Sequence, residues 1–250
     1  MKRFGLIGYP LGHSFSKGYF IEKFIREDRP DSVYENFPLD SAGGLPELIA
    51  SHPDLQGLNV TIPHKQAVLS CLDELDQQAA QIGAVNCIKI TRSGGKIHLK
   101  GYNTDAWGFG RSLAEMLGKE RPDALVLGTG GASKAVAYVL KQLGIRFRFV
   151  SRTGDGEAIL SYEGLTPETI ARTRLIVNTT PLGTYPDTGA MPAIPYDGIG
   201  RGHFLHDLVY NPSETAFLRE GRVREAAVKN GYAMLVGQAE RSWEIWNGTE

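Results

Sequence analysis

A short stretch around residue 60 carries an amide, a hydroxyl and an ammonium group at spacings that suit a binding site. Asn59 and Thr61 are two residues apart, so on the predicted strand Leu58–Ile62 both side chains point to the same face. Pro63 ends that strand and can open a helix, which places Lys65 in the first helical turn. We therefore expect this stretch to present polar groups to a ligand.

Lys65 has an ordinary interpretation and a chemical one. A lysine at a helix start is usually a solvated surface residue. A chemical role needs a partner, and Asp105 is the candidate, since it follows a predicted strand that ends in a polar segment. Asp105 either caps the predicted helix 106–117 or pairs with Lys65 and orients it for proton transfer.

Other polar side chains stand near the ends of predicted elements. Ser14 and Ser16 lie at the mouth of the first predicted helix, where serines commonly cap the helix. Their hydroxyls could instead bind an anion such as a carboxylate. Asn86 stands near the start of the predicted strand 84–90, and Gln238 near the start of the last predicted helix, where an exposed glutamine is the ordinary interpretation.

A glycine-rich turn predicts a dinucleotide site. The predicted strand 124–127 runs into Gly128, Gly130, Gly131 and Ala132, and a helix follows at once. Glycines let the backbone turn tightly and approach a pyrophosphate, which the helix N-terminus then binds. An ordinary glycine-rich turn is the alternative, but the flanking strand and helix favour a nucleotide site.

The end of the next predicted strand, 147–150, bears on the choice of nucleotide. An enzyme that uses NAD places an acidic residue there, whereas this chain has Ser151, Arg152 and Thr153. An arginine and two hydroxyls suit a 2′-phosphate, so NADP is favoured, although Asp155 just beyond speaks for NAD. The crossover helix that normally follows this strand is expected to be shortened or absent.

Strands and helices alternate along the chain, which is typical of an α/β fold with mostly parallel sheets. The expected strands are 4–8, 33–37, 58–62, 84–90, 97–102, 124–127, 147–150, 175–178 and 204–210. Besides the first and last helices, the expected helices are 45–50, a helical run from 69 to 83, 106–117, 135–140, 167–172 and 216–229. Thr180 falls in a polar loop at the carboxyl end of one strand, where such folds bind ligands. We expect an N-terminal α/β domain followed by a Rossmann-type dinucleotide-binding domain.

Composition narrows the class of protein. The 250 residues are 42% hydrophobic and 22% charged, with a net charge of −1, which gives no electrostatic basis for binding nucleic acid or an anionic membrane. The apolar run near the N-terminus is too short for a signal peptide and no later run could span a bilayer, so we expect a cytoplasmic protein. Cys71 and Cys87 are expected to be buried thiols, and no histidine or cysteine grouping has the spacing of a metal site. The expected partner is a small molecule.

Seven segments together resemble the shikimate dehydrogenase family, whose members reduce 3-dehydroshikimate to shikimate with NADP in aromatic amino acid biosynthesis. The resemblance covers nearly the whole chain. Its segments occur in the family's order: Gly8-Tyr9-Pro10 with His13-Ser14-Phe15-Ser16, Asn59-Val60-Thr61-Ile62-Pro63-His64-Lys65, Gly83-Ala84-Val85-Asn86, Asn103-Thr104-Asp105, Gly128-Thr129-Gly130-Gly131-Ala132, Asn178-Thr179-Thr180-Pro181-Leu182-Gly183, and Met234-Leu235-Val236-Gly237-Gln238-Ala239.

The resemblance implies roles for particular residues. It implies a substrate-binding catalytic domain from residues 1–103 and 232–250, and a Rossmann-type NADP-binding domain from residues 104–231. By the same resemblance Ser14, Ser16 and Thr61 hold the substrate carboxylate, Asn59, Asn86, Asp105 and Gln238 hold its ring hydroxyls, Lys65 and Asp105 act on the reacting oxygen, and Tyr210 and Gly231 flank the nicotinamide.

Three residues depart from the family's usual pattern. Lys17 stands where the family usually has proline, Ser151 replaces an asparagine, and Thr184 replaces a methionine. Because the loop after Thr153 also lacks a second basic residue, a quinate/shikimate dehydrogenase that prefers NAD is an alternative. A non-catalytic sensor that binds shikimate-like molecules is another. The assembly is expected to be a monomer or a homodimer.

Overall fold

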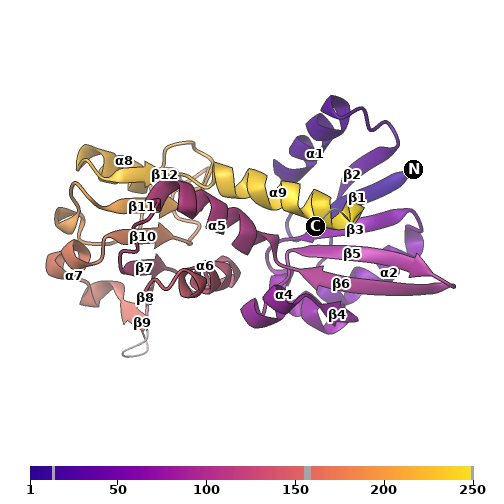
Figure 1. The fold of residues 1–250 in the computed structure, drawn as a ribbon, viewed down its shortest axis with the longest axis horizontal. Coiled ribbons are helices and arrows are strands. Elements are labelled where there is room, and N and C mark those ends of the chain that lie inside the picture. The colour runs from indigo at the N-terminus through magenta and orange to yellow at the C-terminus, as the bar shows by residue number, and fades with distance from the viewer. Residues whose placement is uncertain (13–14, 155–158, 249–250) are drawn as a thin grey trace. The chain divides into compact units, whose positions relative to one another are not determined.

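The computed structural model of the protein describes residues 1–12, 15–154 and 159–248 (Figure 1). The chain forms two compact units. The first contains Met1–Thr104 together with the C-terminal segment from Ala239 onward, and the second is Asp105–Gln238. The chain therefore crosses from one unit to the other twice, directly before Asp105 and directly after Gln238.

The first unit contains a six-stranded mixed sheet in the order β2-β1-β3-β5-β6-β4. β1 pairs in parallel with both β2 and β3, β3 and β5 pair antiparallel, β5 and β6 form an antiparallel hairpin, and β4 pairs in parallel with β6. Its strands are β1 (Lys2–Gly8), β2 (Ser32–Pro38), β3 (Leu55–Val60), β4 (Glu74–Leu75), β5 (Cys87–Ser93) and β6 (Lys96–Tyr102). Its helices are α1 (Phe15–Arg26), α2 (Leu45–Ser51), α3 (His64–Ala67) and α4 (Gln77–Ile82).

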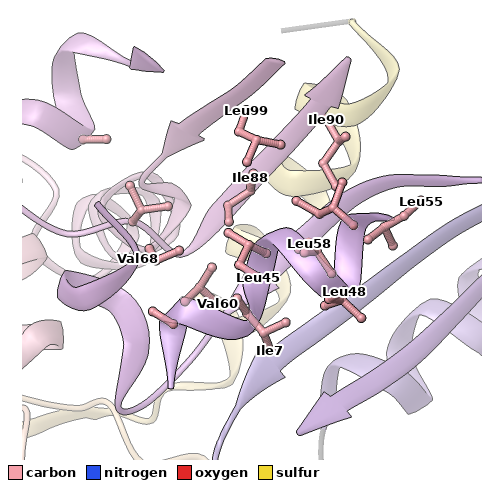
Figure 2. Packing of buried hydrophobic residues seen from close by; sticks show 14 residues of the cluster. Ile7, Leu45, Leu48, Leu55, Leu58, Val60, Val68, Ile88, Ile90 and Leu99 are labelled. Atoms are coloured by element: carbon pink, nitrogen blue, oxygen red, sulfur yellow. The ribbon is translucent and has the colours of Figure 1, made fainter. Parts of the chain in front are cut away.

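Apolar clusters cover both faces of this sheet. Figure 2 shows one of them, in which side chains of the strands and of α2 point toward one another, among them Ile7, Leu45, Leu58, Val60 and Ile88. The cluster on the other face brings residues of α1 and of the C-terminal part of α9 onto the sheet: Phe4, Leu6, Phe20, Phe24, Tyr34, Cys87, Ala239, Ile245 and Trp246. Because side chains alternate along a strand, the neighbours of Leu58 and Val60 in β3 face this second cluster.

Trp246 ties the end of the chain into this unit. Its indole Nε1 donates a hydrogen bond of 3.0 Å to the carbonyl oxygen of Ile88. A Cβ on Gly57 would overlap the indole, so glycine in β3 lets the ring lie flat against the strand. Lys23 of α1, which is itself buried, adds a partly buried ion pair of 2.7 Å with Glu240 of α9.

The second unit contains a parallel sheet of six strands in the order β12-β11-β10-β7-β8-β9. Numbered within the unit and read from β9, this order is 3-2-1-4-5-6, the doubly wound topology of dinucleotide-binding domains. Its strands are β7 (Ala124–Leu127), β8 (Phe147–Ser151), β9 (Ile159–Ser161), β10 (Leu175–Asn178), β11 (Phe204–Asp207) and β12 (Ala227–Lys229). Its helices are α5 (Thr104–Leu117), α6 (Gly131–Gln142), α7 (Pro167–Arg172), α8 (Ala216–Val223) and the first part of α9 (Tyr232–Asn247). The predicted α/β fold class is confirmed.

The crossover after β8 is short, as predicted. β8 and β9 are parallel neighbours, yet only residues 152–158 connect them. Such a connection is too short for a full crossover helix, which needs a dozen residues or more.

Several predicted elements are wrong in extent. The run from 69 to 83 is not one helix, because Asp76 accepts hydrogen bonds from the backbone N–H groups of Gln78 and Ala79 and so begins α4, while Glu74–Leu75 pairs with β6. The predicted helix 216–229 ends at Val223, and its last residues form β12 beside β11. Strand pairing outweighs helix periodicity in both places.

Three strand ends also differ from their predictions. The strand predicted at 58–62 starts earlier and ends at Val60, that predicted at 84–90 begins only at Cys87, and that predicted at 204–210 ends at Asp207. Cys87 is buried as expected, whereas Cys71 is only partly buried.

Candidate active site

Thr61 follows β3 directly, one residue beyond the end of the strand. Its backbone N–H donates to the carbonyl oxygen of Ile7 in β1 at 2.9 Å. A Cβ on Gly8 would overlap the Thr61 methyl group, so glycine at the end of β1 makes room for this side chain. The prediction that Asn59 and Thr61 lie on one continuous strand is therefore wrong, because β3 ends between them at Val60. Both residues nevertheless lie at the carboxyl end of β3.

Lys65 lies in α3, a single helical turn that begins after Pro63, as predicted. Lys65 is partly buried. Its carbonyl oxygen accepts a hydrogen bond of 2.8 Å from the N–H of Val85. His64 anchors the same turn, with its Nε2 2.6 Å from the carbonyl oxygen of Leu39. The backbone of Lys65 is therefore fixed next to the segment that leads into β5.

Asn59 lies at the centre of a buried polar network in the first unit. The hydroxyl of Tyr34 donates to Asn59 Oδ1 at 2.9 Å. Asn59 Nδ2 donates to Ser242 Oγ at 2.9 Å and to the carbonyl oxygen of Asn86 at 3.2 Å. Since both amide protons serve the fold and the residue is 3% exposed, the group that Asn59 can still offer a ligand is a lone pair of Oδ1.

The same network fixes Asn86 and the residue before Asp105. Asn86 Nδ2 donates to Thr104 Oγ1 at 2.9 Å, and the backbone N–H of Thr104 donates to Asn86 Oδ1 at 2.6 Å. Thr104 Oγ1 and Ser242 Oγ are 3.2 Å apart, which closes the network. Asp105 itself is buried at the start of α5.

Tyr34, Thr104 and Ser242 connect the predicted site residues and were missed by the sequence reasoning. Burial raises the pKa of Tyr34 well above its usual value, and a hydrogen bond with Ser16 counteracts part of that rise. Tyr34 looks like any strand residue in the sequence. Ser242 gave one usable signal, because it stands four residues after Gln238 and so shares its face of the helix. Ser14 lies outside the described residues.

The glycine-rich turn has the conformation that its residues predict. Gly128 has φ of +101°, and a Cβ there would lie 2.9 Å from Thr179 Oγ1 and 3.0 Å from the Thr180 methyl group. Gly130 caps α6, which begins at Gly131, and no other atom lies within 4 Å of where its Cβ would be. Open backbone at a helix N-terminus can bind a phosphate through its N–H groups. Ala132 follows, partly buried, in the first turn of α6.

Ser151, Arg152 and Thr153 lie at the carboxyl end of β8, next to the glycine-rich strand β7. Ser151 Oγ accepts a hydrogen bond of 3.1 Å from the N–H of Gly154 and so closes the turn. Arg152 and Thr153 are exposed. The Arg152 charge reaches Tyr162, where it partly offsets the rise in pKa that burial causes. A cation is thus available at the end of this strand.

Thr180, Tyr210 and Gly231 lie in the segments that follow β10, β11 and β12 respectively. Thr180 donates to Asn178 Oδ1 through both its N–H, at 3.0 Å, and its hydroxyl, at 2.6 Å. Tyr210 is half-buried, and this burial raises its pKa. Gly231 donates to the carbonyl oxygen of Val209 at 3.0 Å, and a Cβ on Gly231 would overlap the carbonyl oxygen of Leu208. Only glycine fits at position 231.

The predicted site residues are divided between the two units. Ser16, Asn59, Thr61, Lys65 and Asn86 belong to the first. The second contains the predicted cofactor residues and Tyr210, and it begins at Asp105 and ends at Gln238. Gln238 is buried in α9, and its Nε2 donates to the carbonyl oxygen of Leu235 at 3.0 Å.

Across residues 1–12, 15–154 and 159–248, no three histidine, cysteine, aspartate or glutamate side chains gather as metal ligands would. Over the same residues, every helix is too short or too polar to cross a membrane.

Known proteins resemble this chain along its whole length. Residues 6–88 match the shikimate dehydrogenase substrate binding domain. The shikimate dehydrogenase (NADP(+)) of Methanococcus maripaludis is 38% identical, over 99% of this chain and 92% of its own.

Two solved structures have the same fold. Shikimate 5-dehydrogenase from Thermus thermophilus, in complex with NADP(H) and shikimate, is 32% identical with a TM-score of 0.85, and the match covers 99% of this chain and 94% of that one. Quinate dehydrogenase from Corynebacterium glutamicum, in complex with NAD, is 31% identical with a TM-score of 0.85 at the same coverage.

Proposed function

The chain belongs to the shikimate dehydrogenase family, and from this premise we propose that it catalyses the NADP-dependent, reversible reduction of 3-dehydroshikimate to shikimate. The enzyme is an oxidoreductase of aromatic amino acid biosynthesis. The observation that supports this most strongly is the near full-length similarity to a shikimate dehydrogenase that binds NADP(H) and shikimate.

The second unit fits the cofactor. Its doubly wound sheet, the positive φ of Gly128 and the open backbone at Gly130 suit a pyrophosphate at the start of α6. Gly128, Gly130, Gly131 and Ala132 would hold that group. Ser151, Arg152 and Thr153 would hold the adenosine 2′-phosphate, and Thr180, Tyr210 and Gly231 would border the nicotinamide.

Lys65 is the proposed acid and base. NADPH, when bound, supplies the hydride for the ketone carbon. Protonated Lys65 Nζ gives a proton to the developing alkoxide oxygen, and in the reverse direction neutral Lys65 takes it back. Asp105 orients the lysine and accepts a hydrogen bond from a substrate hydroxyl.

The remaining polar side chains would select the substrate. The hydroxyls of Ser14, Ser16 and Thr61 would donate hydrogen bonds to its carboxylate, and Asn86 and Gln238 would bind its ring hydroxyls. Asn59 would contribute at most an acceptor, because its two amide protons already bind Ser242 and Asn86. Its main proposed task is to hold Asn86 in place.

Domain roles and cellular context complete the proposal. Residues 1–103 and 232–250 would form the substrate-binding domain and residues 104–231 the NADP-binding domain. The protein would act in the cytoplasm as a monomer or a homodimer. No partner beyond its substrate and cofactor is needed for the reaction.

One alternative has an observation in its favour. The similar quinate dehydrogenase was solved with NAD, and the loop after Ser151 is where the two nucleotides are distinguished. Steady-state rates with NADP⁺ and NAD⁺, each on shikimate and on quinate, separate the two enzymes. We expect the highest kcat/KM with NADP⁺ and shikimate. A higher value with NAD⁺ and quinate would overturn the assignment, and failure to reduce either nucleotide would favour a non-catalytic sensor.

A further inference from the structure

We propose that Asp207 is a positioning residue for the cofactor site, because its carboxylate fixes the orientation of the Asn178 side chain and thereby the position of Thr180. This inference rests on the proposed NADP-dependent function. None of the family-derived roles above involves Asp207, which is buried behind the loop rather than exposed in it.

Asp207 ends β11 and is completely buried. Its Oδ1 accepts hydrogen bonds from Asn178 Nδ2 at 2.9 Å and from the backbone N–H of Val209 at 3.0 Å. Its Oδ2 accepts a hydrogen bond of 2.6 Å from the hydroxyl of Thr215. Three donors from three segments of the chain thus converge on one carboxylate.

These contacts leave the Asn178 amide a single orientation. An ionised carboxylate can only accept hydrogen bonds, so the amide nitrogen must face Asp207. The amide oxygen then faces Thr180, whose backbone N–H can only donate. A residue at 207 that could both donate and accept would also tolerate the reversed amide, in which nitrogen faces the Thr180 N–H and that bond is lost.

The segment held in this way lies against the glycine-rich turn. Thr179 Oγ1 donates to the carbonyl oxygen of Leu127 at 2.7 Å, and Thr179 and Thr180 fill the space where Gly128 lacks a side chain. A change in the Asn178 orientation therefore displaces atoms next to the turn that would hold the pyrophosphate. Asp207 acts on the cofactor through this contact and not directly.

Burying this carboxylate opposes its ionisation. Desolvation raises the pKa of Asp207 to about 6, although the bonds from Thr215, Val209 and Asn178 favour the charged form. A charged carboxylate at this position thus costs stability near neutral pH, as expected of a residue that serves a ligand site rather than the fold alone.

Other ionisable groups surround the carboxylate. Burial, the charge of Glu220 and the charge of Asp207 raise the pKa of Tyr196, which stays neutral. Glu220 of α8 pairs with Arg224, the residue that follows this helix. Burial and, to a smaller extent, the charge of Lys229 in β12 lower the pKa of His206, the residue before Asp207. The His206 imidazole lies against Ser112, with Nε2 2.9 Å from Ser112 Oγ.

The test compares Asp207→Asn with the wild-type enzyme. The substitution keeps the size of the side chain and makes it both donor and acceptor. We expect the Kd for NADP⁺, measured by equilibrium binding at pH 7.5, to rise roughly 3- to 10-fold, since a charge-assisted hydrogen bond is about twice as strong as a neutral one. The melting temperature at the same pH is expected to be unchanged or higher. Asp197→Asn removes a carboxylate that is 94% exposed in the same unit, and it should change neither quantity.

Amide hydrogen exchange gives a readout that does not depend on activity. In Asp207→Asn we expect the amides of 179–183 to lose protection while those of β10 keep it. Unchanged protection and an unchanged Kd would overturn the proposal. A raised Kd with a lower melting temperature and loss of protection throughout β10 and β11 would also overturn it, since Asp207 would then be merely structural.

The wild-type enzyme provides two further checks. If Asp207→Asn does not fold, exchange of the wild type corrected for intrinsic rates should show protection of 179–183 falling as the pH drops from 7.5 to 5, and constant protection would contradict the proposal. If the wild type binds no NADP⁺ at all, the proposed function is refuted. If the wild type binds NADP⁺ and Asp207→Asn binds it equally tightly, only the role of Asp207 is contradicted.

Discussion

Asn59 supports the candidate site mainly through hydrogen bonds to neighbouring residues, because at most one acceptor lone pair remains for a ligand. Its amide joins Tyr34, Ser242 and Asn86, so its loss would release several neighbours at once. A buried amide whose partners are removed costs about 1–3 kcal/mol for each group left without a hydrogen bond. The pairing of Asn59 with Ser242 joins residues 183 positions apart, and no local pattern in the sequence could have indicated it.

Replacing Lys65 tests its proposed role as the acid and base of the reaction. Lys65→Met keeps the length of the side chain and removes the proton that the alkoxide needs, so kcat should fall by about 10²–10⁴. The Kd for shikimate, measured by equilibrium binding, should change little, because the lost contact forms mainly in the transition state. Lys96→Met, at an exposed position of the same unit, is the control. A variant with wild-type kcat would refute the role of Lys65.

His206 and Asp207 are adjacent and have opposite effects on the pH dependence of stability. Burial lowers the pKa of His206 to about 3 and raises that of Asp207 to about 6. Between pH 4 and 6 the unfolded chain binds the extra proton at His206, so this residue destabilises the fold on acidification. Over the same range the folded chain binds the extra proton at Asp207, so that residue stabilises it on acidification.

The two contributions nearly cancel in the wild type, and Asp207→Asn should expose the histidine's effect. We expect the free energy of unfolding of Asp207→Asn, relative to the wild type, to fall by about 1 kcal/mol per pH unit between pH 6 and 4. Urea denaturation at several pH values measures the difference. Parallel pH profiles for the two proteins would show that Asp207 is already ionised throughout this range.

At the scale of elements, turns and strand ends determine where the site residues stand. The glycine-rich turn, β7 and α6 could be predicted because strand, glycines and helix follow one another without interruption. The helical run from 69 to 83 could not, since the pairing of Glu74–Leu75 with β6 depends on residues far along the chain. The short link after β8 was predictable because the sequence there lacks a helical apolar pattern.

Gly231 provides the prediction for an element. A Cβ in Gly231→Ala would overlap the carbonyl oxygen of Leu208, so the start of α9 or the end of β11 must shift. We expect a loss of about 1–3 kcal/mol in the free energy of unfolding and weaker NADP⁺ binding. Gly189→Ala is the control, because nothing lies within 4 Å of where its Cβ would be. Equal stability and equal NADP⁺ affinity for both variants would contradict this packing argument.

For the whole molecule, the part of α9 from Ala239 onward is as much a part of the first unit as β1 is. Trp246 lies against Phe4 with ring centroids 4.9 Å apart, and the indole covers Gly57 in β3. The sequence alone does not indicate which sheet Trp246 covers, because one apolar helix face fits any complementary surface. Only the family resemblance implied that the segment returns to the N-terminal domain.

Trp246→Ala tests this dependence. Removing a large buried aromatic side chain typically costs about 3–5 kcal/mol, and here the cost should fall on the first unit. Calorimetry should show the transition of that unit at a lower temperature, while the Kd for NADP⁺ stays near the wild-type value. Ile25→Ala, whose side chain is 77% exposed in α1, should leave both unchanged. A variant that loses NADP⁺ binding and keeps the first transition would contradict the assignment.

The double crossing of the chain also has a consequence for its synthesis. The strands of the first unit are synthesised before Asp105, whereas Trp246 is synthesised only after the whole second unit, which ends at Gln238. At about 5–20 residues per second, the sheet that contains β1 waits roughly 7–30 s for the helix that covers one of its faces. One face of that sheet therefore stays without the C-terminal part of α9 while the whole second unit is synthesised.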